Sequence, residues 1–261
     1  MQLGSHVPAP TPLVTADRLG MDVVQLHLSA PRQWRDPLPR ADADELRGSG
    51  RVAAAHATYL CNPASANPDV RAKSWHALQA TLDAAATVGA AGVVVHAGQA
   101  GPAGTVDEAV ERWVEGVGAL TGDVPLLIEN TASGQAAPGR ALADWIRLVL
   151  AVREVAAVPI GVCLDTCHAF AGDPDAASDP AGWTRALRDA VGAVDLLHVN
   201  DSGVAAGAGR DRHARLGQGA MGLDTLAGFV TTAGAPAALL ETPGDDDERV
   251  ADLAVLAELV G

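Results

Sequence analysis

Short apolar runs recur along the whole chain, and most of them are rich in valine, leucine and alanine. They occupy residues 3–7, 21–28, 51–56, 92–96, 124–129, 159–165, 194–201 and 236–241. Continuous apolar runs of this length are typical of strands that are buried on both faces of a parallel sheet. The pattern therefore predicts eight strands of this kind.

Between these runs, apolar residues follow the three-to-four-residue spacing of amphipathic helices. The clearest helical segments are residues 70–90, 105–120, 139–156, 180–193 and 245–260. Thr105 and Glu108 have the spacing of a capping box, and the aspartates at 245–247 favour a solvated helix start, where the helix dipole stabilises negative charge. Strand–helix alternation of this kind predicts a (β/α)8 TIM barrel, with a doubly wound sheet as the alternative. No break in composition marks a linker, so we expect a single domain over residues 1–261.

Six consecutive predicted strands, the third to the eighth, end in a residue that commonly binds metal. These residues are His56, His96, Glu129, Asp165, His198 and Glu241. In a barrel, the carboxyl ends of all strands open onto the same face. One polar strand end is ordinary, but six in succession predict a shared site. Imidazole and carboxylate ligands without thiolate suit zinc or manganese in a hydrolytic site.

The segment "GVCLDTCHAFAG" at residues 161–172 contains two cysteines beside two of the polar candidates. A redox or cysteine–zinc site is one interpretation, but the chain has three cysteines and no C-x-x-C pair. Cys163 alternates with Asp165 along a strand, and Cys167 borders the following loop. We interpret both cysteines as packing residues and Asp165 with His168 as the functional pair.

A further candidate pair follows the seventh apolar run. Asp211 and His213 form a D-x-H sequence in a glycine-rich loop, where neither side chain serves a hydrophobic core. Together with His168, they raise the number of candidate ligands to nine. A catalytic zinc commonly takes three protein ligands, so three metals fit this count better than one or two.

Composition changes this picture in two respects. The net charge of −14 counts against nucleic-acid binding, unless bound metal reverses the local charge. Lys73 is the only lysine and has no framing glycines, which excludes a P-loop and disfavours Schiff-base chemistry. "GQGAMG" at 217–222 does not follow a strand, so we expect no nucleotide cofactor.

The chain also lacks an amino-terminal signal pattern and any apolar stretch near the roughly 20 residues that a membrane helix needs. We therefore expect a cytoplasmic protein without a membrane partner.

Taken together, these motifs resemble the endonuclease IV family of apurinic/apyrimidinic endonucleases, which are xylose-isomerase-like TIM barrels. The matching segments are "GSHV" at 4–7, "PRQW" at 31–34, "HATYLCN" at 56–62, "VHAG" at 95–98, "ENTAS" at 129–133, "CLDTCHAFAG" at 163–172, "HVND" at 198–201, "DRHARLGQG" at 211–219 and "ETP" at 241–243. They follow the family's order, and "LDTCHAF" and "DRH" are the most specific.

The resemblance implies a cluster of three zinc ions. His56 and His96 would hold one zinc, with Glu129 bridging to a second that Asp165, His198 and Glu241 complete. His168, Asp211 and His213 would hold the third. Among these ligands, Glu129, Asp165 and His168 are the expected catalytic residues.

The resemblance also implies a partner and a reaction. Duplex DNA containing an abasic site would be bound by a monomer, with Arg32, Tyr59 and Arg212 as DNA-binding residues. Zinc-dependent hydrolysis would cut the backbone 5′ to the abasic site and leave a 3′-hydroxyl and a 5′-deoxyribose phosphate. Three Zn²⁺ ions would add six positive charges, taking the chain from −14 to −8 and making the barrel mouth locally positive.

Two alternatives remain open at the level of sequence. Ala97, Thr58, Ser29, Ala30 and Gln218 depart from residues usual in the family, in segments where DNA would be gripped. A non-catalytic lesion-binding relative is therefore one alternative. The other is a metal-dependent sugar isomerase or epimerase of related barrels, which has a shorter ligand set and little use for His168, Asp211 and His213.

Two further histidines are expected near the site without being ligands. His6 lies in the first-strand motif, where we expect it to support the site, and His27 ends the second strand as a hydrogen-bonded residue of the barrel mouth.

Overall fold

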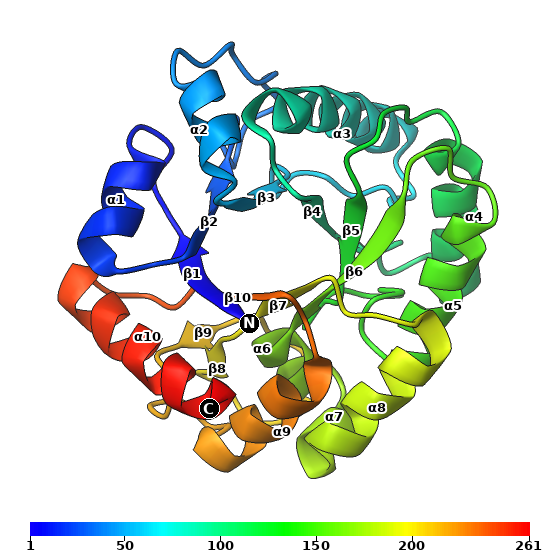
Figure 1. Ribbon diagram of the computed structural model, residues 1–261. Coiled ribbons are helices and arrows are strands. Elements are labelled where there is room, and N and C mark those ends of the chain that lie inside the picture. The colour runs from blue at the N-terminus through cyan, green and yellow to red at the C-terminus, as the bar shows by residue number, and fades with distance from the viewer.

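Eight parallel strands close into a barrel in the computed structural model, which describes all 261 residues (Figure 1). The strands are β1 (Gln2–His6), β2 (Val23–His27), β3 (Val52–His56), β4 (Val93–His96), β5 (Leu126–Glu129), β6 (Ile160–Asp165), β7 (Leu196–His198) and β10 (Ala237–Leu240). Each strand pairs with the next along the chain, and β10 closes the barrel against β1. The eight predicted strands and the TIM-barrel fold are confirmed.

A ring of helices surrounds the barrel (Figure 1). Its members are α1 (Pro12–Leu19), α2 (Ala43–Ser49), α3 (Pro68–Val88), α4 (Val106–Val117), α5 (Leu142–Arg153), α8 (Pro180–Val191), α9 (Leu223–Ala233) and α10 (Asp246–Val260). The five predicted helices correspond to α3, α4, α5, α8 and α10. None of the helices combines the length and the apolar character that crossing a bilayer requires.

Helix ends follow the predicted capping chemistry. The Thr105 side chain accepts a hydrogen bond from the Glu108 N–H, and the Glu108 side chain accepts one from the Thr105 N–H. Asp245 and Glu248 form a second capping box at the start of α10. The aspartates at 245–247 therefore begin a helix, as predicted.

Several short elements were not predicted. They are α1, α2 and α9 of the outer ring, the helices α6 (Thr166–Gly172) and α7 (Pro174–Ser178) after β6, and a small antiparallel sheet of β8 (Asp201–Ser202) and β9 (His213–Ala214). Most span only two to eight residues, which is too short for a hydrophobic period to stand out. α9 is longer, but it begins directly after Gly222 and contains Gly228.

The inner layer of the barrel places the strand ends. Eight buried side chains fill it: Val23, Ala54, Val94, Leu127, Cys163, Leu196, Ala237 and Leu239. Side chains two positions apart on a strand point to the same face. The residue two positions after each inner-layer side chain therefore also points into the barrel, one layer nearer its mouth. Cys163 is part of this inner layer, as its interpretation as a packing residue predicts.

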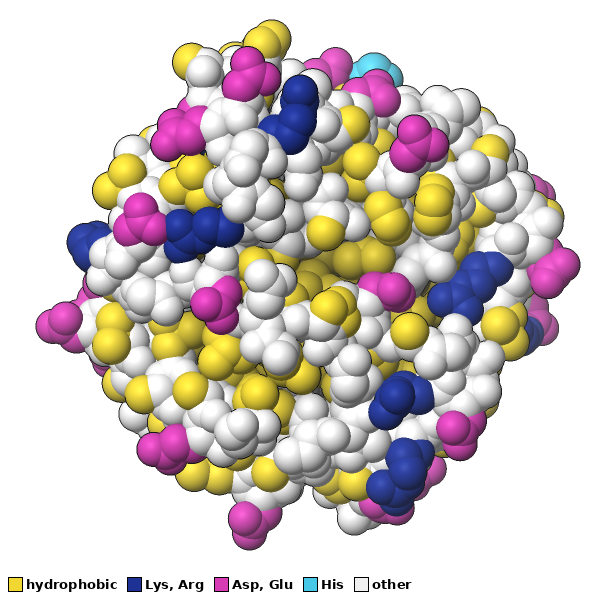
Figure 2. Space-filling model, viewed as in Figure 1, with side chains coloured by type: hydrophobic (Ala, Val, Ile, Leu, Met, Phe, Trp, Pro, Cys, Tyr) yellow, Lys and Arg dark blue, Asp and Glu magenta, His cyan; other side chains and the backbone are white.

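A second and larger core of 55 buried residues lies between the barrel and the helices. Trp113 and Trp145 are fully buried there, and Trp183 is nearly so. Figure 2 shows the side of the barrel on which the amino terminus lies, where hydrophobic side chains line the central hollow and scattered acidic and fewer basic side chains surround it. Histidine is visible only at the edge of this face.

Candidate metal centre

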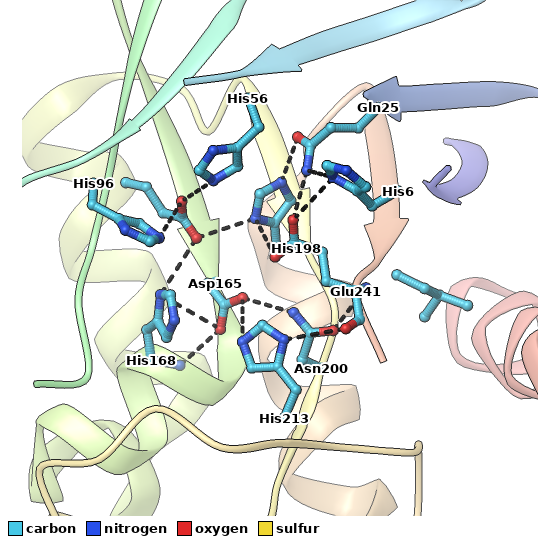
Figure 3. A network of polar contacts seen from close by, with 12 residues as sticks. His6, Gln25, His56, His96, Asp165, His168, His198, Asn200, His213 and Glu241 are labelled. Atoms are coloured by element: carbon cyan, nitrogen blue, oxygen red, sulfur yellow. Dashed lines mark hydrogen bonds and ion pairs between the residues drawn. The ribbon is translucent and has the colours of Figure 1, made fainter. Parts of the chain in front are cut away.

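The nine predicted donor residues meet at the carboxyl ends of the strands, where the labelled imidazole rings face one another (Figure 3). Five of them end β3, β4, β5, β6 and β7, and Glu241 directly follows β10. His168 lies in the first turn of α6, Asp211 lies in the loop that leads into β9, and His213 is the first residue of β9.

Glu129 lies at the centre of the cluster and is 1% exposed. Its Oε2 atom is 3.4 Å from His56 Nε2 and 3.3 Å from His96 Nε2. Its Oε1 atom is 3.1 Å from His198 Nδ1 and 3.3 Å from His168 Nδ1. One carboxylate thus contacts rings from four different segments of the chain.

Three groups contain only nitrogen and oxygen donors, with ligand atoms within 4.8 Å of one another, and two further groups include Cys163 or Cys167. One contains His56, His96 and Glu129, the second Glu129, Asp165, His198 and Glu241, and the third His168, Asp211 and His213. In the third group, Asp211 lies between the rings, 3.3 Å from His168 Nε2 and 3.2 Å from His213 Nε2. These groups match the three sets of residues that the resemblance assigned to separate metals, and their roles as ligands remain predictions.

In several rings, one nitrogen is hydrogen-bonded to a carbonyl oxygen, which fixes the tautomer. His56 Nδ1 lies 2.8 Å from the Ala57 carbonyl, His168 Nδ1 lies 3.0 Å from the Asn130 carbonyl, and His198 Nε2 lies 2.9 Å from Gln25 Oε1. A carbonyl oxygen accepts, so each of these nitrogens carries the proton. In the neutral ring, the other nitrogen then turns its lone pair toward the carboxylates.

This arrangement fits divalent cations. The lone pairs of His56 Nε2 and His168 Nε2 face carboxylate oxygens at 3.4 and 3.3 Å, and such pairs repel unless a positive charge lies between them. Glu129 Oε2 and His213 Nε2 are closed off from solvent and have no hydrogen-bond partner in the protein. All nine donors are nitrogen or oxygen, the set that zinc accepts in hydrolytic sites.

The pKa values of the cluster's side chains show how burial and neighbouring charges act on each of them. Burial disfavours ionised Glu129, but the neighbouring His96 and His198 rings outweigh it and hold the pKa of Glu129 well below its usual range. Burial also opposes charge on His213, yet Asp165 and Asp211 raise the pKa of His213 to about 9. Burial lowers the pKa of His96 to about 4, assisted by His56 and His168. The carboxylates therefore favour a neighbouring positive charge.

Cys163 and Cys167 differ from these donors because their side chains stay protonated. Burial raises the pKa of both Cys163 and Cys167 to about 12, so both remain thiols at neutral pH. Cys167 Sγ contacts the Arg212 carbonyl at 3.6 Å.

Gln25 is a buried residue that the sequence analysis missed. Its Nε2 atom donates to Glu241 Oε1 at 2.6 Å and lies 3.1 Å from His6 Nδ1, while its Oε1 atom faces His198 (Figure 3). The available signal was an amide within the apolar run "DVVQLHL".

Asn130 and Asn200 were also missed as individual residues, although both lie in motifs used for the resemblance. Asn200 Nδ2 donates to Asp165 Oδ2 at 2.7 Å, and its Oδ1 accepts from the Glu241 N–H at 2.9 Å. Asn130 exchanges two hydrogen bonds with the backbone of Asp165. The two amides thus fix Asp165 and Glu241 in place.

The two extra histidines lie where we expected them. His6 Nδ1 is 3.7 Å from Glu241 Oε1. His27 Nδ1 contacts the His56 carbonyl at 3.0 Å, and burial, with help from His56 and His6, lowers the pKa of His27 to about 3.

The predicted DNA-binding residues are not all in one place. Arg32 and Tyr59 line a cavity of about 480 Å³ together with five of the candidate ligands. Arg212 is exposed in the loop beside the cluster and does not line this cavity. Arg215 lies in the same segment, and its guanidinium is paired with Glu248 and Asp252.

The loop that carries Asp211 and His213 is folded around Asp201. Asp201 is fully buried, and its carboxylate accepts hydrogen bonds from the N–H groups of Ser202, Gly217, Gly219 and Met221. The glycines of "GQGAMG" therefore have a structural explanation.

Comparisons with known proteins agree with this geometry. The xylose isomerase-like TIM barrel family matches residues 13–259. The probable endonuclease 4 of Mycobacterium leprae is 42% identical over 258 residues, covering 99% of this chain and 98% of that protein. The crystal structure of endonuclease IV from Thermus thermophilus is 31% identical, with a TM-score of 0.83, and covers 100% of this chain and 99% of its own. A D-tagatose 3-epimerase-like protein shares the fold, at 18% identity and a TM-score of 0.75 over 100% of this chain and 97% of its own.

Proposed function

Because this chain belongs to the endonuclease IV family of xylose isomerase-like TIM barrels, we propose that it is a zinc-dependent endonuclease that cuts DNA 5′ to abasic sites. The observation that carries the proposal is the convergence of nine donors in three groups, with Glu129 at their centre. The partner is duplex DNA that contains an abasic site.

The proposed cofactors are three zinc ions. His56, His96 and Glu129 would hold one, Glu129, Asp165, His198 and Glu241 the second, and His168, Asp211 and His213 the third. Zinc in such sites supplies a water-derived nucleophile at neutral pH and neutralises charge that develops on a phosphate.

The side chains of the cluster would position the reacting phosphate. Hydrolysis adds water across the bond between phosphorus and the 3′-oxygen, leaving a 3′-hydroxyl and a 5′-deoxyribose phosphate. Glu129 and Asp165 are held rigidly by buried partners, so the reacting phosphate meets a preorganised set of charges. Loops are generally more mobile than strands, but Asp201 fixes the loop that carries Asp211 and His213.

Tyr59 and Arg32 would contact the lesion. Tyr59 is 47% exposed, and its ring lies 5.4 Å from the His56 ring and 6.2 Å from the His96 ring, measured between centroids. Burial, together with Glu241 and Glu129, raises the pKa of Tyr59 to about 12, so its phenol keeps its proton. A neutral aromatic side chain in this place suits packing against an unpaired sugar.

The epimerase alternative is less well supported. The similarity to the D-tagatose 3-epimerase-like protein extends to the fold alone. An isomerase site with one or two metals leaves the group of His168, Asp211 and His213 without a purpose.

Incubation of the zinc-loaded protein with a labelled duplex that carries one abasic site tests the proposal. We expect a single cut 5′ to the lesion, a 3′ end that a polymerase extends, and no cut after treatment with a chelator. Binding without cleavage would favour a lesion-binding relative, and one metal equivalent per chain would favour an isomerase-type site.

A further inference from the structure

A groove of about 740 Å³ opens beside the candidate centre, along the carboxyl ends of β1 and β2. A smaller cavity of about 230 Å³ lies between this groove and the cluster, and Tyr59, His213 and Glu241 line it on the cluster side. Two side chains line both spaces: His6 from the end of β1 and Arg249 from α10. We call the region between these two side chains, where the two spaces adjoin, the passage.

His6 presents a hydrogen-bond donor to this passage. Gln25 Nε2 faces the Glu241 carboxylate at 2.6 Å, which fixes the amide with its nitrogen on that side. The same nitrogen lies 3.1 Å from His6 Nδ1, so Nδ1 accepts its second proton (Figure 3). The neutral His6 ring must then carry its own proton on Nε2.

Arg249 supplies a positive charge at the same place. Its side chain is 17% exposed, and Nη1 lies 3.1 Å from Asp246 Oδ1. The Asp246 carboxylate also receives Arg18, so one negative charge is shared between two guanidinium groups. Arg249 Nε has no acceptor in the protein. No other lysine or arginine lines the smaller cavity.

The competing groups nearby are already engaged. Ser5 Oγ donates to the Leu240 carbonyl, and Thr242 Oγ1 donates to Asp252. In the outer groove, Arg40 is bound to Asp42, and Asp36 lies 2.9 Å from His76 Nε2. Apart from Glu241 of the cluster, Asp36 is the acidic side chain that lines these two spaces, and it is hydrogen-bonded to His76.

We propose that His6 and Arg249 form an anion subsite that binds a backbone phosphate of the cleaved strand, adjacent to the phosphate at the metal centre. A strand whose scissile phosphate lies at the cluster would continue past these two side chains, because the two cavities adjoin there. A phosphodiester carries the negative charge and the acceptor oxygens that these two side chains match. The inference rests on the proposed function, since it places a second phosphate of the same substrate.

Substitution of Arg249 tests the subsite in the zinc-loaded protein. We expect Arg249→Gln to raise KM for abasic duplex about tenfold with kcat little changed, because a charge-assisted contact to bound substrate is lost. The salt dependence of log kcat/KM becomes less steep by about one. Arg249→Lys keeps most of that salt dependence. Arg18→Gln is the matched control, because Arg18 contacts the same Asp246 but does not line the passage.

Neutral methylphosphonates, placed singly at the phosphates that flank the lesion, identify the contact. One position is expected to raise KM for the wild type but not for Arg249→Gln. The subsite is refuted when Arg249→Gln behaves like Arg18→Gln, or when every methylphosphonate affects both proteins equally. If the wild type binds the duplex without cutting it, the proposed function fails, and the same variants and duplexes still test the subsite through their dissociation constants and salt slopes.

Discussion

Glu129 organises the candidate centre at the scale of single residues. Both of its oxygens are shared between rings: His56 and His96 approach Oε2, while His168 and His198 approach Oε1. The carboxylate is almost completely buried, so its charge is compensated only by what these rings or a bound cation supply. Loss of this one side chain removes the carboxylate that two of the three groups share.

Glu129→Ala and His168→Ala are each expected to lower nicking of abasic duplex by at least about a hundredfold, because each removes a shared or terminal donor of the cluster. Both proteins should keep the circular dichroism of the wild type. His76→Ala is the control, since His76 is exposed and contacts only Asp36. Wild-type rates in either cluster variant would contradict the assignment.

Gln25 connects three residues of the site through one amide. Its Oε1 atom accepts from His198 Nε2, and its Nε2 atom donates to Glu241 Oε1. The other carboxylate oxygen, Glu241 Oε2, lies 3.4 Å from His198 Nδ1. An amide is suited to this place because it donates and accepts at the same time.

Gln25→Leu should lower zinc affinity or nicking by about ten- to a hundredfold, the usual effect of losing a residue that orients metal ligands. The leucine has a similar size, but it leaves the His198 N–H without an acceptor. Zinc titration and nicking kinetics measure the change. Gln79→Leu, on exposed α3 surface where Gln79 contacts Asp83 and Thr121, should behave as the wild type. Equal effects of both substitutions would argue against a role for Gln25 in the site.

At the scale of elements, the segment after β7 delivers the third group. It forms the small sheet of β8 and β9 and then turns around Asp201, whose carboxylate binds four N–H groups. Gly219 lies against that carboxylate: a Cβ atom there would be 2.4 Å from Asp201 Oδ1 and 2.5 Å from the Ser202 carbonyl. Only glycine fits at position 219, because the Asp201 carboxylate is held by four N–H groups and cannot move away from a Cβ atom.

Gly219→Ala is expected to displace the loop and to reduce bound zinc from about three to about two equivalents per chain, with nicking reduced about tenfold or more. Metal analysis after gel filtration measures the loss. Gly203→Ala in the same segment is the control, because its Cβ would meet nothing nearer than 3.4 Å. If Gly219→Ala retained the full metal content, Asp201 would not control the geometry of the third group.

At the scale of the whole molecule, charge and metal binding are coupled. The chain carries a net charge of −14, and four of its carboxylates converge at the mouth of the barrel. A DNA-binding surface on such a body depends on cations held at the cluster and on the few arginines around it.

Removal of zinc by a chelator should lower the melting temperature by at least about 5 °C, because ions that bind only the folded chain stabilise it. Without the ions, the buried carboxylates of the cluster also repel one another. Differential scanning calorimetry before and after chelation gives the shift, and added zinc should restore it. Glu129→Ala should show a smaller shift. A melting temperature that stays unchanged after chelation would argue against resident metal.

The strand ends were predictable because their cause is local. Alternation along a strand places Glu129 two residues after Leu127, and Asp165 two residues after Cys163, on the inner face whatever the rest of the chain does. The five long helices were predictable for the same reason. Short helices such as α1 and α2 were not, because they hold too few residues to define a period.

The sequence by itself determined the direction in which each strand-end ligand points and the end of the barrel at which it lies, since both follow from neighbours a few residues away. Only the tertiary structure decided which side chains meet. Gln25 and Glu241 are 216 positions apart and touch because β1 and β2 are joined to β10 by the closure of the barrel. Arg215 likewise pairs with Glu248 and Asp252 of α10, more than 30 positions away, only because α10 docks beside its segment. Contacts between distant segments depend on how the strands close and the helices dock, and that information is not contained in any single stretch of the chain.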